Sequence, residues 1–196
     1  MAMTRSTSAK TRQAKMLFSE AYRAECENTS IQINTALLQK DDNALEINID
    51  SIKEHDIKIL TKVLSIATKL TYLSVKSNHA STNATKLNKH GVNKLELSNS
   101  IIRSIFLITK LNNIVSIELD GLPFAASSLT LLEKSLNATP FLTKLVISNI
   151  PLGDTGVKIL LKPMKGLRLK NLTLSHCQIT DRGVNDLTNH LNVNMF

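Results

Sequence analysis

Five histidines and two cysteines are the side chains of this 196-residue chain best able to bind a metal ion or attack a substrate. No two histidines stand three or four residues apart, the spacing that would bring both to one face of a helix. His176 and Cys177 are neighbours, but adjacent side chains of a strand point to opposite faces and so hold one ion poorly. The spacing therefore predicts no metal site.

Nucleophiles and acid–base pairs are equally sparse. Cys177 falls at an inward-facing position of the repeat described below, so we interpret it as core rather than as a nucleophile. The carboxylate pairs Asp41–Asp42 and Glu54–Asp56 suit exposed charge and helix caps. The sequence contains no phosphate-binding loop, no dinucleotide-binding glycine motif and no nucleophile elbow. We therefore predict that the chain is not an enzyme and uses no cofactor.

The net charge of +8 is concentrated between residues 53 and 110. This basic segment is either a solvated helix face or a patch that binds nucleic acid. Aromatic residues make up only 4% of the chain, so side chains for base stacking are scarce and the first interpretation is favoured. The two cysteines lie far apart in sequence, which indicates a reducing compartment rather than a disulfide-bonded fold. No apolar run reaches the length of about 18 residues that a membrane span needs.

Apolar residues recur in a fixed pattern that determines the architecture. The pattern fits L-x-x-L-x-L-x-x-(N/C/L)-x-L, the signature of a leucine-rich repeat. Its clearest copies begin at Leu142 and Leu169. Weaker copies precede them, so that the units begin at positions 44, 70, 92, 114, 142 and 169.

Each unit combines two periods. The alternation of Leu145 and Ile147 is typical of a strand with one buried face, Gly153 marks a turn, and Val157 and Leu160 recur at helical spacing. No unit can bury its apolar face alone, so neighbours must stack. The sequence predicts an α/β leucine-rich-repeat solenoid of the ribonuclease-inhibitor-like type, with parallel strands on the concave face, helices on the convex face and an N-terminal helical cap.

The predicted organisation is a disordered tail over 1–10, a helical cap over 11–43 and six leucine-rich repeats over 44–196. The first 18 residues also resemble a mitochondrial targeting segment, but acidic residues follow directly and the stretch suits a capping helix. The irregular segment 78–91 is predicted to be a mobile loop. Because the last repeat has no evident cap, we expect the chain to be a fragment of a longer protein, with a fold-back of its last residues as the alternative.

The concave face is the predicted binding surface. It is mixed and polar with one aromatic side chain, which suits a protein or peptide better than nucleic acid or a membrane. The alternative is that these side chains are merely solvated. We expect a monomer that binds a protein partner through Tyr72, Lys76, Lys94, Glu96, Glu118, Asp120, Lys144, Asn149, Asn171 and His176.

The stretch 117–187, with its motifs IPLGDTG and CQITDRG, resembles the family of 78-kDa centrosomal proteins. Three N-terminal motifs, LFSEAYRAECEN, ALEINID and LTYLSVKSN, are similar to that family in order and spacing, so the resemblance covers about residues 17–192. The single repeat motifs are shared with other ribonuclease-inhibitor-like proteins. A GTPase regulator or an actin-end binder of that class therefore stays an alternative.

The resemblance implies a non-enzymatic scaffold of the centriole. Members of the family support cilium assembly and help to control a centrosomal ubiquitin ligase, so the implied location is the cytoplasm, the centrosome and the base of the cilium. The implied partners are centriolar proteins or the ubiquitin ligase. The family's further repeats and C-terminal coiled coil have no counterpart in this sequence, so functions carried by that tail are not implied.

Overall fold

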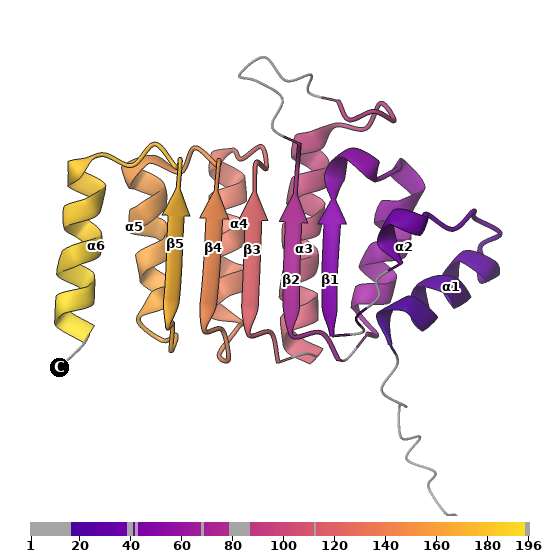
Figure 1. Cartoon of the computed structure of the whole chain (residues 1–196), viewed down its shortest axis with the longest axis horizontal. Helices are drawn as coiled ribbons and strands as arrows, with labels where there is room; N and C mark the ends of the chain where they lie inside the picture. Colours follow the sequence, from indigo (N-terminus) through magenta and orange to yellow (C-terminus); the bar gives the residue numbers. More distant parts are fainter. Residues whose placement is uncertain are drawn as a thin grey trace, which may run out of the picture.

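Five parallel strands, in the order β1-β2-β3-β4-β5, form one sheet with helices packed on one of its faces (Figure 1). The computed structural model describes residues 17–38, 41, 43–67, 69–78, 87–111 and 113–194, without the side chains of 106–111 and 191–194. The strands are β1 (Ala44–Asn48), β2 (Tyr72–Lys76), β3 (Ser116–Asp120), β4 (Lys144–Ser148) and β5 (Asn171–Ser175). The helices are α1 (Phe18–Asn28), α2 (Glu54–Leu64), α3 (Lys94–Leu111), α4 (Ala126–Asn137), α5 (Gly153–Met164) and α6 (Asp181–Asn194), with short 3₁₀ turns η1 (Thr35–Leu37) and η2 (Ile49–Ser51).

Alternation along each strand places the core between the sheet and the helices. Leu73, Ile117 and Leu145 stand opposite one another in neighbouring strands, and all three are buried. Side chains one position away face outward and are more exposed in β3 and β4. The predicted fold class, a ribonuclease-inhibitor-like leucine-rich-repeat stack of parallel strands and helices, is confirmed.

The prediction of a strand in the unit that begins at position 92 is wrong. The segment is α3, and the described residues contain five strand units where six repeats were predicted. Both periods fit here, because Leu95 and Leu97 alternate while Leu97, Ile101 and Ile105 follow helical spacing and are buried. The helix is favoured by Asn93, whose side-chain oxygen accepts hydrogen bonds from the backbone N–H groups of residues 95 and 96 at 3.0 and 3.3 Å.

The first repeat is also shifted from its predicted register. Ala44 pairs with Tyr72, the third residue of the next unit, so the first unit starts two residues earlier than predicted. A shift of two preserves the alternation, and Leu45 and Ile47 are the buried pair. Ile49, which the predicted register assigned to the strand, is buried in the 3₁₀ turn that follows β1.

At the N-terminal end of the stack, α1 packs against α2 (Figure 1) and η1 packs against β1. Asp56, fully buried at the start of α2, accepts hydrogen bonds from the Tyr22 hydroxyl at 3.2 Å and from the Asn34 side chain at 2.8 Å. Its second oxygen also accepts the backbone N–H of Lys53 at 2.8 Å. One carboxylate therefore joins α1, the segment before η1 and the first repeat.

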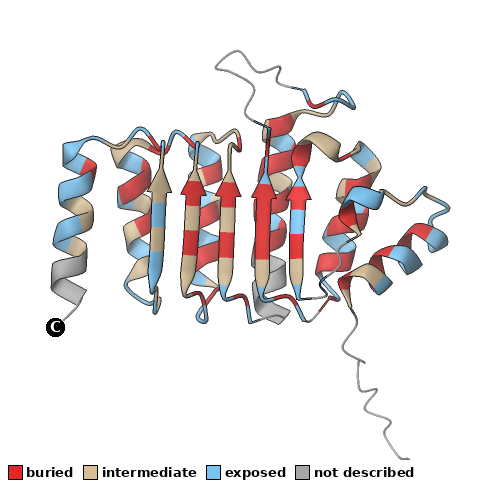
Figure 2. Cartoon of the chain, viewed as in Figure 1, coloured by how far each residue is buried: buried red, intermediate tan, exposed pale blue. Residues whose placement is uncertain are grey.

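The opposite end of the stack is less buried. Leu172 and Leu174 of β5 are half-buried, whereas Leu145 and Ile147, their partners in β4, are completely buried (Figure 2). Val184 of α6 is 50% exposed. Because no repeat packs against the far side of β5 in the described chain, its inner side chains lack the second neighbour that each inner strand has.

Some predictions lie outside the described residues. These are the disordered tail over 1–10, residues 11–16 of the helical cap, the centre of the predicted mobile loop at 79–86, and the last two residues of the proposed fold-back. Within the described residues, none of the helices has the length and apolar character required to cross a membrane.

Candidate functional site

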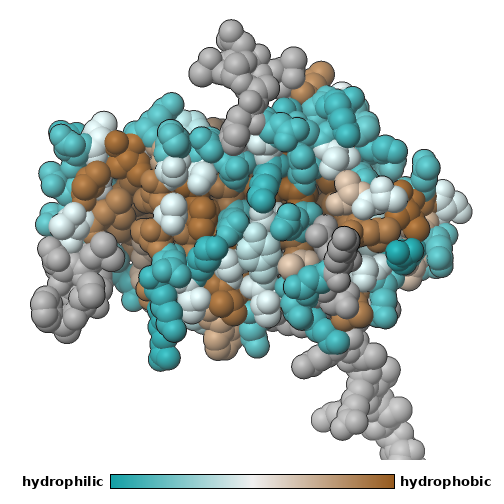
Figure 3. All heavy atoms as spheres, viewed as in Figure 1, coloured by the Kyte–Doolittle hydropathy of each residue, from teal (hydrophilic) through white to brown (hydrophobic). Residues whose placement is uncertain are grey.

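The outward-facing side chains of β1–β5, together with the residue that follows each strand, form what we call the sheet surface. Parallel in-register pairing arranges them in rows that run across the strands. Polar side chains dominate over β2 to β4, and apolar side chains gather toward the β5–α6 end (Figure 3). Of the ten predicted site residues, the structure places eight on this surface: Tyr72, Lys76, Glu118, Asp120, Lys144, Asn149, Asn171 and His176.

Three of them make one cluster across three neighbouring strands. The Tyr72 hydroxyl of β2 donates a hydrogen bond to Glu118 Oε2 of β3 at 2.9 Å. Lys144 Nζ of β4 donates to the other oxygen, Glu118 Oε1, at 2.6 Å. Tyr72 and Lys144 flank Ser116 in one row, and Glu118 lies in the adjoining row of the central strand. We call these three residues the Tyr–Glu–Lys cluster.

The cluster is fixed by its own electrostatics. The hydrogen bond from Lys144 lowers the pKa of Glu118, aided by the Tyr72 hydroxyl and by the charge of Lys76. Burial raises the pKa of Tyr72, and the Glu118 carboxylate, which accepts a hydrogen bond from its hydroxyl, raises it further. At neutral pH Glu118 is therefore a carboxylate and Tyr72 an un-ionised phenol. The hydrogen bond to Glu118 holds the Tyr72 hydroxyl on the sheet surface.

A second contact ties the ends of β3 and β4. Asn149 Nδ2 donates to Asp120 Oδ1 at 2.8 Å. Asn149, Gly121 and His176 follow their strands at equivalent places, and all three have left-handed backbones with φ between 54° and 64°. Asparagine tolerates this conformation better than most residues, and its side chain here is turned onto the neighbouring strand. Lys76 and Asn171 are exposed on the same surface.

The remaining two predicted site residues are not on the sheet surface, which corrects the prediction. Lys94 and Glu96 lie in the first turn of α3, because that segment is a helix and not a strand. Lys94 is buried and pairs with Asp50 Oδ1 at 2.6 Å. Burial favours the neutral form of Asp50, but hydrogen bonds from Lys94 and from the backbone of Asn78 outweigh it and lower its pKa. Lys94 therefore joins α3 to the first turn of the repeat stack.

Neither cysteine is suited to nucleophilic chemistry. Cys26 and Cys177 are buried, and burial raises the pKa of both thiols, so little thiolate forms at neutral pH. In the part of the chain that the structure describes, no three His, Cys, Asp or Glu side chains gather closely enough to hold a metal ion.

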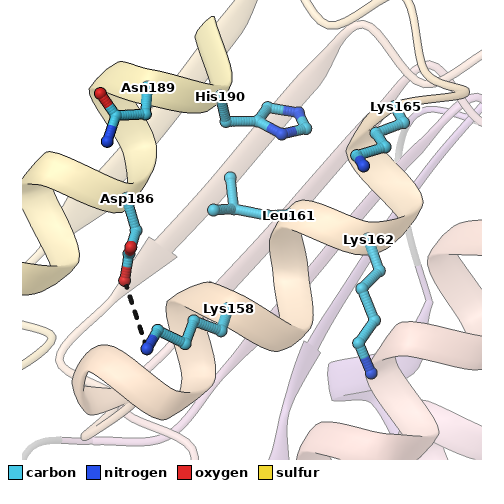
Figure 4. A pocket seen from close by; sticks show the side chains of 7 residues that line it. All are labelled: Lys158, Leu161, Lys162, Lys165, Asp186, Asn189 and His190. Carbon is cyan, nitrogen blue, oxygen red and sulfur yellow. Dashed lines mark ion pairs between the residues drawn. The ribbon is translucent and has the colours of Figure 1, made fainter.

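Sequence reasoning missed a second polar feature, a groove between α5 and α6 with a volume of about 390 Å³ (Figure 4). Lysines line one side of it. The signal was present in the sequence, since Lys158, Lys162 and Lys165 follow the spacing of one helix face.

Comparison with known proteins places the fold. No protein-family model matches the chain. A 73-residue stretch is 33% identical to the centrosomal protein of 78 kDa of Homo sapiens, and the match spans 37% of this chain but only 11% of that protein. The fold is similar to the C-terminal domain of tropomodulin from Caenorhabditis elegans, with a TM-score of 0.50 and 12% identity over 88% of this chain and 92% of that one. The chain thus has the leucine-rich-repeat fold, and part of its sequence has a distant match to the centrosomal protein.

Proposed function

We propose that this chain is a non-enzymatic interaction module whose sheet surface binds a segment of a protein partner. The observation that carries the proposal is the Tyr–Glu–Lys cluster. Tyrosine is one of the side chains that most often dominate binding energy at protein interfaces, and a ring already fixed in place loses little conformational entropy on binding. Tyr72 is held by Glu118 on the central strand of the sheet, where a partner would lie.

The charges around the cluster support a protein partner over nucleic acid. Glu118 and Asp120 alternate on the sheet surface with Lys76 and Lys144, so both signs are interleaved across three strands. A phosphate backbone would be repelled by the two carboxylates, whereas a peptide offers both donors and acceptors. From the basic segment 53–110, Lys76 lies on this surface, whereas Lys94 and Arg103 belong to α3 and not to the sheet.

We further propose that the module acts at the centriole, supports cilium assembly and takes part in the regulation of a centrosomal ubiquitin ligase. The support is the 33% identity to the 78-kDa centrosomal protein and the similarity of the N-terminal motifs. Since the match spans about a tenth of that protein, activities of its other regions are not part of the proposal.

Expression of the tagged chain in ciliated human cells tests both parts. We expect the parent chain to collect at centrioles and a Tyr72→Ala variant to spread through the cytosol, because truncation of a central aromatic side chain commonly weakens binding by about 2 kcal/mol, or thirtyfold. Thr130→Ala, at an exposed position of α4 and so outside the sheet surface, is the control and should localise like the parent.

Two results would count against the proposal. Uniform cytosolic signal from the parent chain would remove the centriolar role while leaving a binding module. Equal centriolar enrichment of parent and Tyr72→Ala, with equal melting temperatures, would remove the sheet surface as the binding face. Sedimentation of the purified chain with actin filaments, or its binding to a purified GTPase, would favour the alternative class.

A further inference from the structure

The groove between α5 and α6 lies on the helical side of the molecule, away from the sheet surface (Figures 1 and 4). Its volume of about 390 Å³ is in the lower part of the range of ligand pockets, roughly 300–1,000 Å³. Leu161 of α5 projects into it, and Asp186 and His190 of α6 form the facing wall. The groove therefore offers room for a few side chains, with an apolar contact at its centre.

The α5 wall of the groove is basic. Lys158 and Lys162 belong to α5, and Lys165 directly follows it. Lys158 points toward Asp186, whereas Lys162 points away from α6 (Figure 4). Lys158 Nζ is 3.7 Å from Asp186 Oδ2, and Lys162 Nζ is 3.5 Å from an oxygen of Glu133 on α4. Both lysines are more than half exposed, so these pairs contribute little to stability and can be exchanged for a ligand. Lys165 makes no ion pair with any residue that the structure describes.

The Asp186 carboxylate narrows the choice of ligand. Its Oδ2 atom is buried and accepts no hydrogen bond from the described residues. Turning the exposed Lys158 side chain toward a ligand carboxylate uncovers this acceptor, which then needs an N–H donor. A peptide carries both carboxylates and amide N–H groups, whereas a bare phosphate at neutral pH has acceptors but few donors.

We infer that the α5–α6 groove is a second binding site, which takes an acidic peptide segment of a protein partner. Lysines of α5 pair with its Asp or Glu side chains, Leu161 contacts an apolar residue among them, and Asp186 accepts a backbone N–H. The site is independent of the sheet surface, so its test does not depend on the function proposed above.

Fluorescence anisotropy of a labelled peptide tests the site. The probe is fluorescein-Gly-Glu-Glu-Leu-Glu-Glu-Gly, and the same peptide with Gln in place of Glu is its neutral counterpart. We expect the purified chain to bind the acidic probe at low salt, and Lys162→Glu/Lys165→Glu to weaken that binding by about tenfold. Lys58→Glu/Lys69→Glu makes the same change of charge at exposed positions outside the groove and should alter binding by less than twofold.

Asp186→Asn should change binding of the acidic probe in the opposite direction to the lysine variants. It removes the carboxylate that competes for Lys158 but keeps an oxygen acceptor, so the acidic probe should bind about threefold more tightly. Circular-dichroism melting of each variant establishes that it is folded. Lys165→Gln, which breaks no ion pair among the described residues, replaces the double variant if that one is unstable, and should weaken binding about threefold.

Three outcomes would overturn the inference. Equal weakening by the groove variant and the remote variant would mean that only net charge attracts the probe. Equal binding of the acidic and neutral peptides would exclude recognition of carboxylates. Tighter, groove-dependent binding of phosphatidylserine vesicles or of single-stranded DNA would assign the groove to a phosphate-bearing ligand.

Discussion

Glu118 is the side chain on which the proposed binding surface depends, since both of its oxygens hold a neighbouring strand's side chain in place. Lys144→Gln should therefore raise the pKa of Glu118 toward its ordinary value of 4.5. Carbon NMR of the labelled carboxyl group measures this shift directly. An unchanged Glu118 titration in the variant would mean that the Lys144 contact is not formed in solution.

The same contact has a consequence for stability that depends on pH. The pKa of Glu118 is lowered in the folded chain, so the contact stabilises the fold above the ordinary pKa of 4.5 and this contribution disappears as the pH falls through the lower folded value. We expect the difference in unfolding free energy between the parent and Lys144→Gln to shrink between pH 6 and about pH 3. Urea unfolding at several pH values checks the trend, and a difference that grows toward acid pH would contradict it.

Gly183 shows why one position of α6 tolerates no side chain. A Cβ atom there would lie 2.5 Å from Asp154 Oδ1 and 2.6 Å from Ile179 Cγ2. Asp154 itself accepts hydrogen bonds from the backbone N–H and the hydroxyl of Thr180, at 2.9 and 2.7 Å, and so joins α5 to the start of α6. The absent side chain is what lets these two repeats approach.

Gly183→Ala should therefore destabilise the chain, although alanine favours helix by about 1 kcal/mol over glycine. The steric cost of pushing Asp154 away from Thr180 is larger, and we expect a net loss of about 1–2 kcal/mol in urea unfolding. Asn185→Ala, at an exposed position of the same helix, should be neutral or slightly stabilising. A stabilised Gly183→Ala would show that α6 can shift without cost.

The elements differ in how far the sequence alone predicts them. β3, β4 and β5 follow the repeat pattern because alternating apolar residues and helical spacing agree there, and turn glycines also follow β3 and β4. In α3 they conflict, since Leu95 and Leu97 satisfy the strand pattern while Ile101 and Ile105 satisfy the helical one, and the capping contact of Asn93 favours the helix. The strand pattern covers only about five residues, whereas the helix extends over eighteen, so the helical pattern decides the structure of this segment.

The candidate site was predictable as a set of residues but not as a cluster. Tyr72, Glu118 and Lys144 all lie at outward positions of the repeat pattern. Their contact depends on β2 pairing with β3, which begins 44 residues later and not 22 as the pattern suggested. The groove lysines were visible in the sequence, but the groove itself depends on how α6 packs on α5.

Asp56 joins the N-terminal cap to the repeat stack. Asp56→Ala would leave the Tyr22 hydroxyl and the Asn34 amide without their buried acceptor. Loss of such a buried network should reduce the unfolding free energy by about 3 kcal/mol. Thr61→Ala removes only an exposed hydroxyl that bonds within α2, so urea unfolding should change by less than about 0.5 kcal/mol. Equal effects of the two variants would contradict the role assigned to Asp56.

Stability should also fall along the stack toward β5. Leu145 and Leu172 are partners in one row, but only Leu145 is completely buried. We expect Leu145→Ala to cost about 3 kcal/mol and Leu172→Ala about 1 kcal/mol, because a half-buried side chain leaves a smaller cavity. The two variants differ only in position, so equal losses in urea unfolding would mean that β5 is covered in solution.

Because the repeats differ in length, they should release different lengths of chain when the molecule is unfolded by force. Adjacent strands begin 28, 44, 28 and 27 residues apart along the chain. Pulled from its two ends in a force-spectroscopy experiment, the stack should peel repeat by repeat from the weakly buried β5 side. Each repeat of 27 or 28 residues then releases roughly 90–100 Å of extended chain, and the 44-residue repeat that contains α3 releases roughly 150 Å. A single long step in the force–extension curve therefore marks the unfolding of that second repeat.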